Sequence, residues 1–466
     1  MNIDTDYLIL GAGASGLAFA DSLLEQADVD VVLVDRRRQP GGHWRDAYPF
    51  VRLHSPSAYY GVNSLALGGD QLIEAGLNEG FYEQADSAEI CDYFDRVLAE
   101  RLEPSGRAGF LAGCEYLGPD GDGHALRDGA SGEVHEVRVR RRVVDARYQE
   151  PEIPATHKPS FDVAAGAAVV PVHRLPEAAA AYRRYALIGA GKTSVDACLW
   201  LIENGVAADR IRWIRPRDGW FHDRAALQPL AQVAAIMEGI SLDAEAAAAA
   251  SDVTELFERL EACGRLLRLD PAVTPTMYRG TMISRRELAA LRTIDDVIRL
   301  GRVRSIGADR IVLEAGEVAT SAEVLHVDCS ARGLRDVPPV PIFGPDRIVL
   351  QQVRHLSPTF NAALLAFVEA KRDDDEDKNR LCPPNPYPNS TLDWGPMMSR
   401  TWMTEFDWMG QRDLSAWVAA SRLNLLRGLP EQASEPRTRQ AIDRYMKNVG
   451  PAIERLHDRA ARAAPS

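Results

Sequence analysis

The N-terminal pattern is a short apolar run, a glycine-rich turn, and then apolar positions at helical spacing. Residues 6–10 predict a buried strand, residues 11–16 read Gly-Ala-Gly-Ala-Ser-Gly, and a helix is predicted from there to about Gln26. A second apolar run, residues 31–34, ends on Asp35. This order of strand, turn, helix and acid-ended strand predicts a βαβ unit that binds a dinucleotide.

Each glycine of the turn has an expected physical role. Gly11 permits the tight turn, Gly13 lets the backbone approach a pyrophosphate, and Gly16 lets the helix pack close to the strand. The phosphates would lie on free N–H groups at the helix start, while Asp35 accepts hydrogen bonds from a ribose hydroxyl. The residues expected to bind this cofactor are Gly11, Gly13, Ala14, Ser15, Gly16, Asp35 and Arg36.

The same pattern returns after a proline-rich stretch at residues 150–176. Residues 185–188 predict a strand, residues 189–194 read Gly-Ala-Gly-Lys-Thr-Ser, and a helix and a second strand follow to residue 214. Serine replaces the third glycine but is small enough for close packing. Gly-Lys-Thr also resembles the end of a P-loop, but Ala186 stands where that motif needs its first glycine.

The two units differ in how their second strands end. The first ends on an acid, which suits a free ribose hydroxyl, and the second on Arg215 with Arg217 close by, which suits a 2′-phosphate. We therefore expect NADP rather than NAD in the second unit; the alternative is that both arginines are solvated strand-end charges. The residues expected to bind this cofactor are Gly189, Gly191, Lys192, Thr193, Ser194, Arg215 and Arg217.

Composition narrows the class of protein. A chain of 466 residues, 46% hydrophobic and 26% charged, suggests two to three globular domains. The net charge of −13 argues against nucleic-acid or anionic-membrane binding, and no apolar run approaches the roughly 20 residues of a membrane span. We expect no signal peptide. The six cysteines are scattered without C-x-x-C spacing, which fits a reducing cytoplasm and predicts no disulfide and no metal site.

Finer motifs resemble the flavin-containing monooxygenases and their Baeyer–Villiger relatives. Asp35 followed by Gly41-Gly42-His43-Trp44 resembles the family's E-x(5)-G-G-x-W pattern, and residues 48–56 resemble the Y-D-x-L-x-L-H-x-P stretch of YUCCA-type members. Residues 143–146 and 328–333 resemble its two crossover motifs. The fingerprint F-x-G-x-x-x-H is missing, because Phe161 lacks the following glycine and His173 comes too late. That departure disfavours Baeyer–Villiger chemistry.

The resemblance implies an α/β fold of two Rossmann-like domains with extra helices. Residues 1–172 and 326–466 would form a discontinuous, three-layer FAD domain. Residues 173–325 would form an inserted NAD(P) domain with a helical insert at about 225–300. FAD would lie on the first turn, with Gly42, His43 and Trp44 added to its site, and NADPH on the second.

The activity implied is a monooxygenase reaction with NADPH and O₂. A C4a-(hydro)peroxyflavin would transfer one oxygen atom to a small molecule, by N- or S-oxygenation rather than Baeyer–Villiger oxidation. His54, Trp44 and Arg52 are the candidate catalytic residues, with His54 placed to hydrogen-bond the peroxide. We expect no nucleic-acid or membrane partner, and a homodimer is the candidate assembly.

Two alternatives stay open at the level of sequence. A flavin oxidase or NAD(P)H oxidoreductase without a stable peroxyflavin would fit the missing fingerprint. A dinucleotide-binding redox sensor without turnover would fit both glycine turns. A disulfide reductase is disfavoured because the chain has no C-x(2–4)-C pair.

Overall fold

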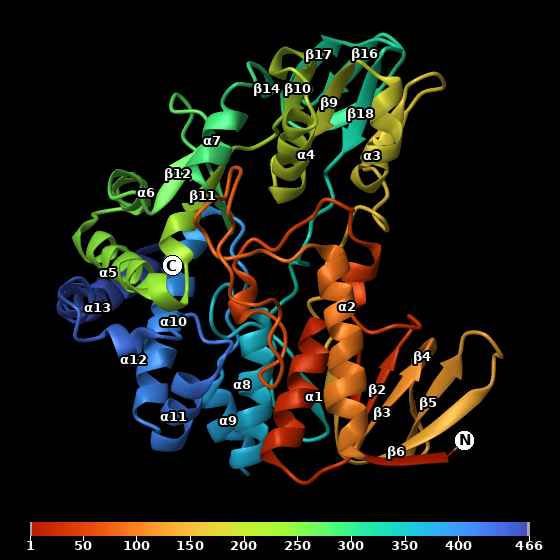
Figure 1. Ribbon diagram of the computed structural model, residues 1–466, viewed down its shortest axis with the longest axis vertical. Helices are drawn as coiled ribbons and strands as arrows, with labels where there is room; N and C mark the ends of the chain where they lie inside the picture. The colour runs from red at the N-terminus through yellow and green to blue at the C-terminus, as the bar shows by residue number, and fades with distance from the viewer. Residues whose placement is uncertain (1, 464–466) are drawn as a thin grey trace.

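Two sheets with parallel centres, one above the other in Figure 1, carry the two glycine turns. The structure is a computed structural model, and it describes residues 2–463. The lower sheet holds the N-terminal unit, and the upper sheet holds the second unit.

The first sheet has seven strands in the order β3-β2-β1-β6-β5-β4, with β19 also paired to β6. Its parallel strands are β1 (Asn2–Leu10), β2 (Val31–Asp35), β3 (Ala108–Ala112), β6 (Val134–Asp145) and β19 (Arg347–Val349). Two antiparallel strands, β4 (Cys114–Asp120) and β5 (Gly123–Asp128), extend it as a meander with β6. Every residue of β2 is buried, as expected for a parallel strand covered on both faces.

Helices cover one face of this sheet and the meander covers the other. On the first face, α1 (Ala14–Gln26), α2 (Ser87–Val97) and α8 (Pro358–Lys371) share one apolar cluster. On the second face, Leu126 of β5 and Val137 of β6 pack against Leu8 and Val34 of the central strands. The result is a three-layer unit whose carboxyl strand ends meet the first glycine turn.

The second sheet has five parallel strands in the order β14-β10-β9-β18-β8. They are β8 (Val169–Pro171), β9 (Arg184–Ile188), β10 (Ile211–Ile214), β14 (Asp296–Ile298) and β18 (Val324–Asp328). On one face lie α3 (Leu175–Ala178), α4 (Lys192–Glu203) and α7 (Arg285–Leu291). A small sheet packs on the other face, formed by β7 (Asp162–Val163), β15 (Val303–Ile306), β16 (Arg310–Leu313) and β17 (Gly316–Ala319).

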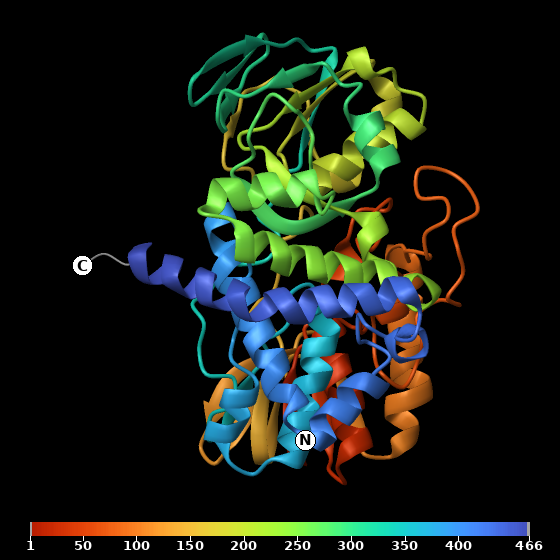
Figure 2. The ribbon, with the colours of Figure 1, turned by 90° about the vertical axis from the view of Figure 1, so that its left-hand side faces the viewer.

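The segment inserted between β10 and β14 packs with the C-terminal helices to form a third region. A three-stranded sheet of β11 (Gly219–Asp223), β12 (Leu266–Arg268) and β13 (Met277–Ile283) carries α5 (Val233–Ala249) and α6 (Val253–Ala262). The later helices are α9 (Asp375–Leu381), α10 (Trp394–Met409), α11 (Arg412–Ala420), α12 (Leu429–Gln432) and α13 (Pro436–Ala463). Figure 2 shows α13 lying along the two helices of the insert, and it shares an apolar cluster with α5, α6 and α10.

The prediction of a helical insert at about 225–300 is wrong in part. The insert also holds the strands β12, β13 and β14, and β14 pairs with β10. The helix α7 ends at Leu291, and its apolar residues Leu288 and Leu291 are buried. Among the described residues, no helix is long and apolar enough to cross a membrane.

Candidate active site

The first glycine turn has the geometry expected of a phosphate-binding turn. Gly11 adopts φ +104°, and a Cβ at Gly16 would lie 2.0 Å from the carbonyl oxygen of Gly11. Gly13, directly before α1, has no side chain to cap the helix, and Ala14 and Ser15 begin its first turn. The N–H groups at this helix start are therefore left for an anion.

Asp35 fixes this turn to the end of β2. One carboxylate oxygen accepts the Ala12 N–H at 2.9 Å, and the other accepts the Arg37 N–H at 2.8 Å. A carboxylate oxygen has two lone pairs, so each keeps one for a ribose hydroxyl. Arg36 points outward and pairs with Glu150 at 2.5 Å, so its side chain faces solvent at the edge of the turn.

The Gly-Gly-His-Trp segment lies directly against the turn. A Cβ at Gly42 would lie 2.9 Å from the Cα of Gly13, so only glycine permits this approach. His43 stacks on Trp44 with ring centroids 5.2 Å apart, and burial lowers the pKa of His43 to about 4. The Trp44 indole N–H donates to the Tyr60 hydroxyl at 2.7 Å.

Arg422, from the C-terminal region, holds the loop that carries Tyr60. Its guanidinium donates to the carbonyl oxygens of Ala58 at 2.8 Å, Tyr60 at 2.7 Å and Val62 at 2.5 Å. Sequence reasoning missed this residue because its partners lie some 360 positions earlier in the chain. The wall beside Trp44 therefore depends on the last hundred residues.

His54 lies between the two units. Its carbonyl oxygen accepts from the Gln84 amide at 3.0 Å and from the Arg224 guanidinium. Burial, followed by the charges of Lys192 and Arg224, holds the pKa of His54 well below its usual range. The imidazole is therefore neutral, with one N–H to donate and one nitrogen to accept.

Arg52 does not join Trp44 and His54. Its side chain is 60% exposed, lies 3.8 Å from Asp86 and donates to the Gln84 carbonyl at 2.9 Å. It occupies the rim of the cleft between the units, where water screens its charge. The catalytic role expected of Arg52 stays a prediction, at a position that lines the cleft.

The second glycine turn is equally constrained. Gly189 adopts φ +134°, and a Cβ there would lie 2.6 Å from the Cys329 carbonyl oxygen. Ser194 is fully buried and its hydroxyl donates to the Gly191 carbonyl at 2.8 Å, so it fills the place of the third glycine without blocking the turn. Thr193 is half-buried in the first turn of α4.

Lys192 and Asp196 connect this turn to the loop after Trp44. The Lys192 ammonium pairs with Asp196 one helical turn later, and the Tyr48 hydroxyl donates to the other oxygen of Asp196 at 2.7 Å. Burial raises the pKa of Asp196 and that of Tyr48. This buried contact joins a loop of the first unit to the helix α4 of the second unit.

Arg215, expected at a ribose 2′-phosphate, is buried and already paired with an acid. Only 3% of the residue is exposed, its guanidinium lies 4.9 Å from the centre of the Trp213 ring, and it pairs with Asp218 at 3.2 Å. Burial lowers the pKa of Arg215, and the side chain serves the packing under β10.

Arg217 lies in a cluster of arginines. Sequence reasoning named Arg217 but not the other members of this cluster. Arg217 donates to the Asn389 side-chain oxygen at 3.2 Å, and Arg279 donates to the same atom at 2.8 and 3.0 Å. Arg279 also donates to the backbone carbonyl of Arg332 at 2.7 Å. Burial, and then the charges of Arg217 and Arg332, lower the pKa of Arg279. The positive charges of the arginines in this cluster therefore outweigh the negative charges beside them.

A cleft of about 900 Å³ runs along α4 between the two units. The rings of Phe50 and Trp200 stack in its wall at 5.3 Å, and a buried pair of Arg224 and Glu287 at 3.0 Å closes its inner side. Its lining holds seven carboxylates against four cations, so the cleft is acidic. The carboxylates are Glu83, Asp86, Glu89, Asp92, Asp196, Glu203 and Glu287, and the cations are Arg52, Arg96, Lys192 and Arg224.

Comparison with known proteins agrees with this architecture. A family model described as an NAD(P)-binding Rossmann-like domain matches residues 9–70. Uncharacterized protein Rv2000 of Mycobacterium tuberculosis and uncharacterized protein Mb2023 of Mycobacterium bovis are each 44% identical over 457 residues, which is 97% of this chain and 84% of theirs. The chain belongs to the Rv2000 family.

Two solved structures show what fold the Rv2000 family resembles. A cyclohexanone-bound crystal structure of cyclohexanone monooxygenase aligns with TM-score 0.50 and 13% identity, over 94% of this chain and 99% of that one. A flavin-containing monooxygenase from Stenotrophomonas maltophilia aligns with TM-score 0.47 and 15% identity, over 82% and 99%. The sheet topology, the family-model match and the match to cyclohexanone monooxygenase confirm the predicted α/β class with Rossmann-like dinucleotide-binding units.

Proposed function

We propose that this protein is an FAD- and NADPH-dependent monooxygenase that transfers one oxygen atom of O₂ to a small molecule. The observation that carries the proposal is the pair of glycine turns in one chain, each closed to any side chain at a critical position. A protein that bound one dinucleotide would need one such turn. Two of them, joined through Tyr48 and Asp196, suit hydride transfer between two cofactors.

The residues present fit FAD in the first unit. Gly13 and Gly42 leave a backbone cradle at the start of α1, and Asp35 keeps lone pairs for a ribose. A bound flavin would store two electrons and react with O₂. The chain's own part is positional: Trp44 and Tyr60 form a wall, and neutral His54 offers a hydrogen bond without adding charge.

The acidic cleft favours nitrogen over sulfur as the site oxygenated. Seven carboxylates against four cations attract a protonated amine, whereas a thioether gains nothing from them. The bound amine would release its proton to solvent before its nitrogen lone pair accepts the oxygen atom. The stacked rings of Phe50 and Trp200 add apolar surface for the rest of such a molecule. We therefore propose an amine substrate, oxidised in a cytoplasmic setting that suits the six free cysteines.

A peroxide-forming NAD(P)H oxidase is the second candidate. It rests on the missing fingerprint: Phe161 is buried against Ile188 and Ile214, and His173 stands apart in the turn Val172–Arg174. NADPH oxidation with a panel of amines and sulfides distinguishes the two. We expect an amine to raise the oxidation rate and to lower the H₂O₂ yield. A yield of one H₂O₂ per NADPH with every compound would favour the oxidase.

A further inference from the structure

Three donors of different chemistry meet on the meander of the first sheet. Cys114 begins β4, Asp128 ends β5, and His135 lies near the start of β6. Strand register brings them together: Cys114 is paired with Asp128, and His135 is paired with Leu126, two residues before Asp128. Residues two apart on a strand share a face, so all three side chains project to the same side of the sheet.

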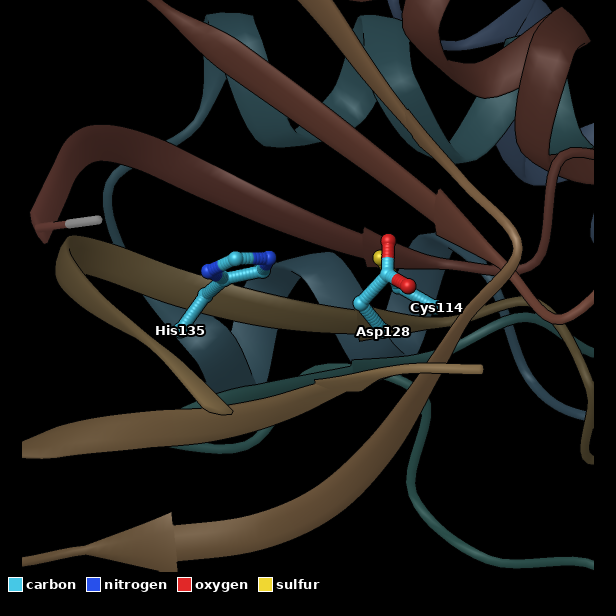
Figure 3. A group of neighbouring side chains, drawn as sticks. All are labelled: Cys114, Asp128 and His135. Atoms are coloured by element: carbon cyan, nitrogen blue, oxygen red, sulfur yellow. The ribbon is translucent and has the colours of Figure 1, made fainter. Parts of the chain in front are cut away.

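The donor atoms are close enough to share one ion. The cysteine sulfur, a carboxylate oxygen and an imidazole nitrogen all lie within 4.8 Å of one another, and Figure 3 shows the three side chains converging. Zinc bonds of about 2.0–2.3 Å in a tetrahedral site place donors roughly 3.3–3.8 Å apart. Side-chain rotations that move each donor by about 1 Å or less would close the site.

The surroundings favour a bound metal over three separate polar groups. Cys114 and His135 are 4% and 5% exposed, and Cys114 lies in an aliphatic cluster with Leu8 and Val34. The turn after β5 orients the carboxylate, because one oxygen of Asp128 accepts the N–H groups of Ala130 at 2.8 Å and Ser131 at 2.7 Å. The other oxygen is left for a metal.

A further carboxylate, that of Glu133, lies beside the His135 ring. An oxygen of Glu133 lies 3.7 Å from Nδ1 of His135, on the same strand boundary. Metal-binding histidines commonly have a carboxylate on the nitrogen that does not bind the ion, which fixes the ring and raises its basicity. This arrangement leaves Nε2 to face the Asp128 and Cys114 side chains.

We propose that Cys114, Asp128 and His135 bind one Zn²⁺ ion, with water as the fourth ligand, and so join β4, β5 and β6. Thiolate and imidazole donors suit Zn²⁺ over Mg²⁺ or Ca²⁺. On binding, the Cys114 thiol loses its proton to solvent and its sulfur forms the bond to the ion. The sequence predicted no metal site because the ligands come from three strands and show no short motif spacing.

Titration of the chelator-treated, flavin-loaded full chain with Co²⁺ tests this site. We expect one Co²⁺ per chain, with tetrahedral ligand-field bands at longer wavelength than the absorption of oxidised flavin, and displacement of those bands by Zn²⁺. Cys114→Ser should abolish the high-affinity phase and its proton release, and His135→Gln should weaken binding about tenfold or more. Cys263→Ser, at an exposed cysteine, is the matched control.

The outcomes of this titration distinguish a Zn²⁺ site at these three residues from no metal site there. Loss of the bands in C114S and H135Q, with wild-type flavin content in both, supports the site. No Co²⁺ or Zn²⁺ binding at micromolar concentration overturns it, and so does binding that survives in C114S or disappears in C263S. If C114S does not fold, Asp128→Asn and H135Q carry the test, because both keep the buried thiol.

Discussion

Gly16 has no room for a side chain, and this makes it the most direct residue-scale test of the flavin site. A Cβ would lie 2.0 Å from a backbone oxygen of the turn itself, where no side chain can move aside. We expect Gly16→Ala to lower FAD occupancy of the purified protein at least tenfold, measured as the ratio of flavin to protein absorbance. Gly450→Ala is the control, because a Cβ there meets open space. Full flavin content in G16A would refute this placement.

Arg279 tests the choice of nicotinamide cofactor. With Arg215 buried, Arg217 and Arg279 are the arginines placed around Asn389 at the carboxyl edge of the second sheet. We predict that Arg279→Ala raises KM for NADPH about tenfold and leaves KM for NADH unchanged, since a charge-assisted contact to phosphate contributes about 1.5–3 kcal/mol. Arg310→Ala, at an exposed arginine paired with Asp309, serves as control. Equal effects on both cofactors would remove Arg279 from this role.

Single residues also show which contacts could be predicted from the sequence and which could not. The roles of Gly11 and Gly16 are local, because the turn closes on itself, and they could be predicted from the motif. Arg279 and Arg422 act on segments far away in the chain, so no local pattern marks them. The burial of Arg215 against Asp218 could not be predicted, because strand position does not tell which way a long side chain turns.

At the scale of elements, the contact between Tyr48 and α4 is the link between the two units. We predict that Tyr48→Phe slows flavin reduction by NADPH about tenfold, because the loop loses its buried hydrogen bond to Asp196. FAD content should not change, since Tyr48 lies outside the first glycine turn. Stopped-flow reduction measures the effect, and Tyr148→Phe, whose exposed hydroxyl bonds only to the Pro338 carbonyl, is the control. An unchanged reduction rate in Y48F would show that this contact does not position the helix.

Long elements with a strong period could be predicted, and short ones could not. The helix that ends at about Gln26 and the strands at 31–34 and 185–188 were predicted nearly at their observed bounds. The three-residue strand β14 was taken for helix, because three apolar residues fit either period and only its pairing with β10 decides. The strands β12 and β13 of the insert were missed as well.

At the scale of the whole molecule, buried neutral histidines make the fold sensitive to acid. Burial lowers the pKa of His43 to about 4 and that of His355 to about 3. In the unfolded chain a histidine has a pKa of about 6.5, so below that pH the unfolded state binds more protons and stability falls as pH falls. The loss ends for each histidine near its folded pKa.

We therefore expect the urea midpoint to fall steadily from pH 6.5 to pH 4. Each of these histidines should contribute roughly 1 kcal/mol per pH unit to the slope of the free energy of unfolding. His355→Gln should make the slope shallower, because it removes one buried neutral histidine. A slope that does not change in H355Q would show that His355 is not a buried neutral group.

The central claim is that one oxygen atom of O₂ enters the product. Turnover of the flavin-loaded protein with NADPH, an amine substrate and ¹⁸O₂, followed by mass spectrometry of the product, measures this directly. We predict that the product carries one ¹⁸O atom and that NADPH is consumed in equal amount. A product without label, or all of the label in H₂O₂, would contradict the account.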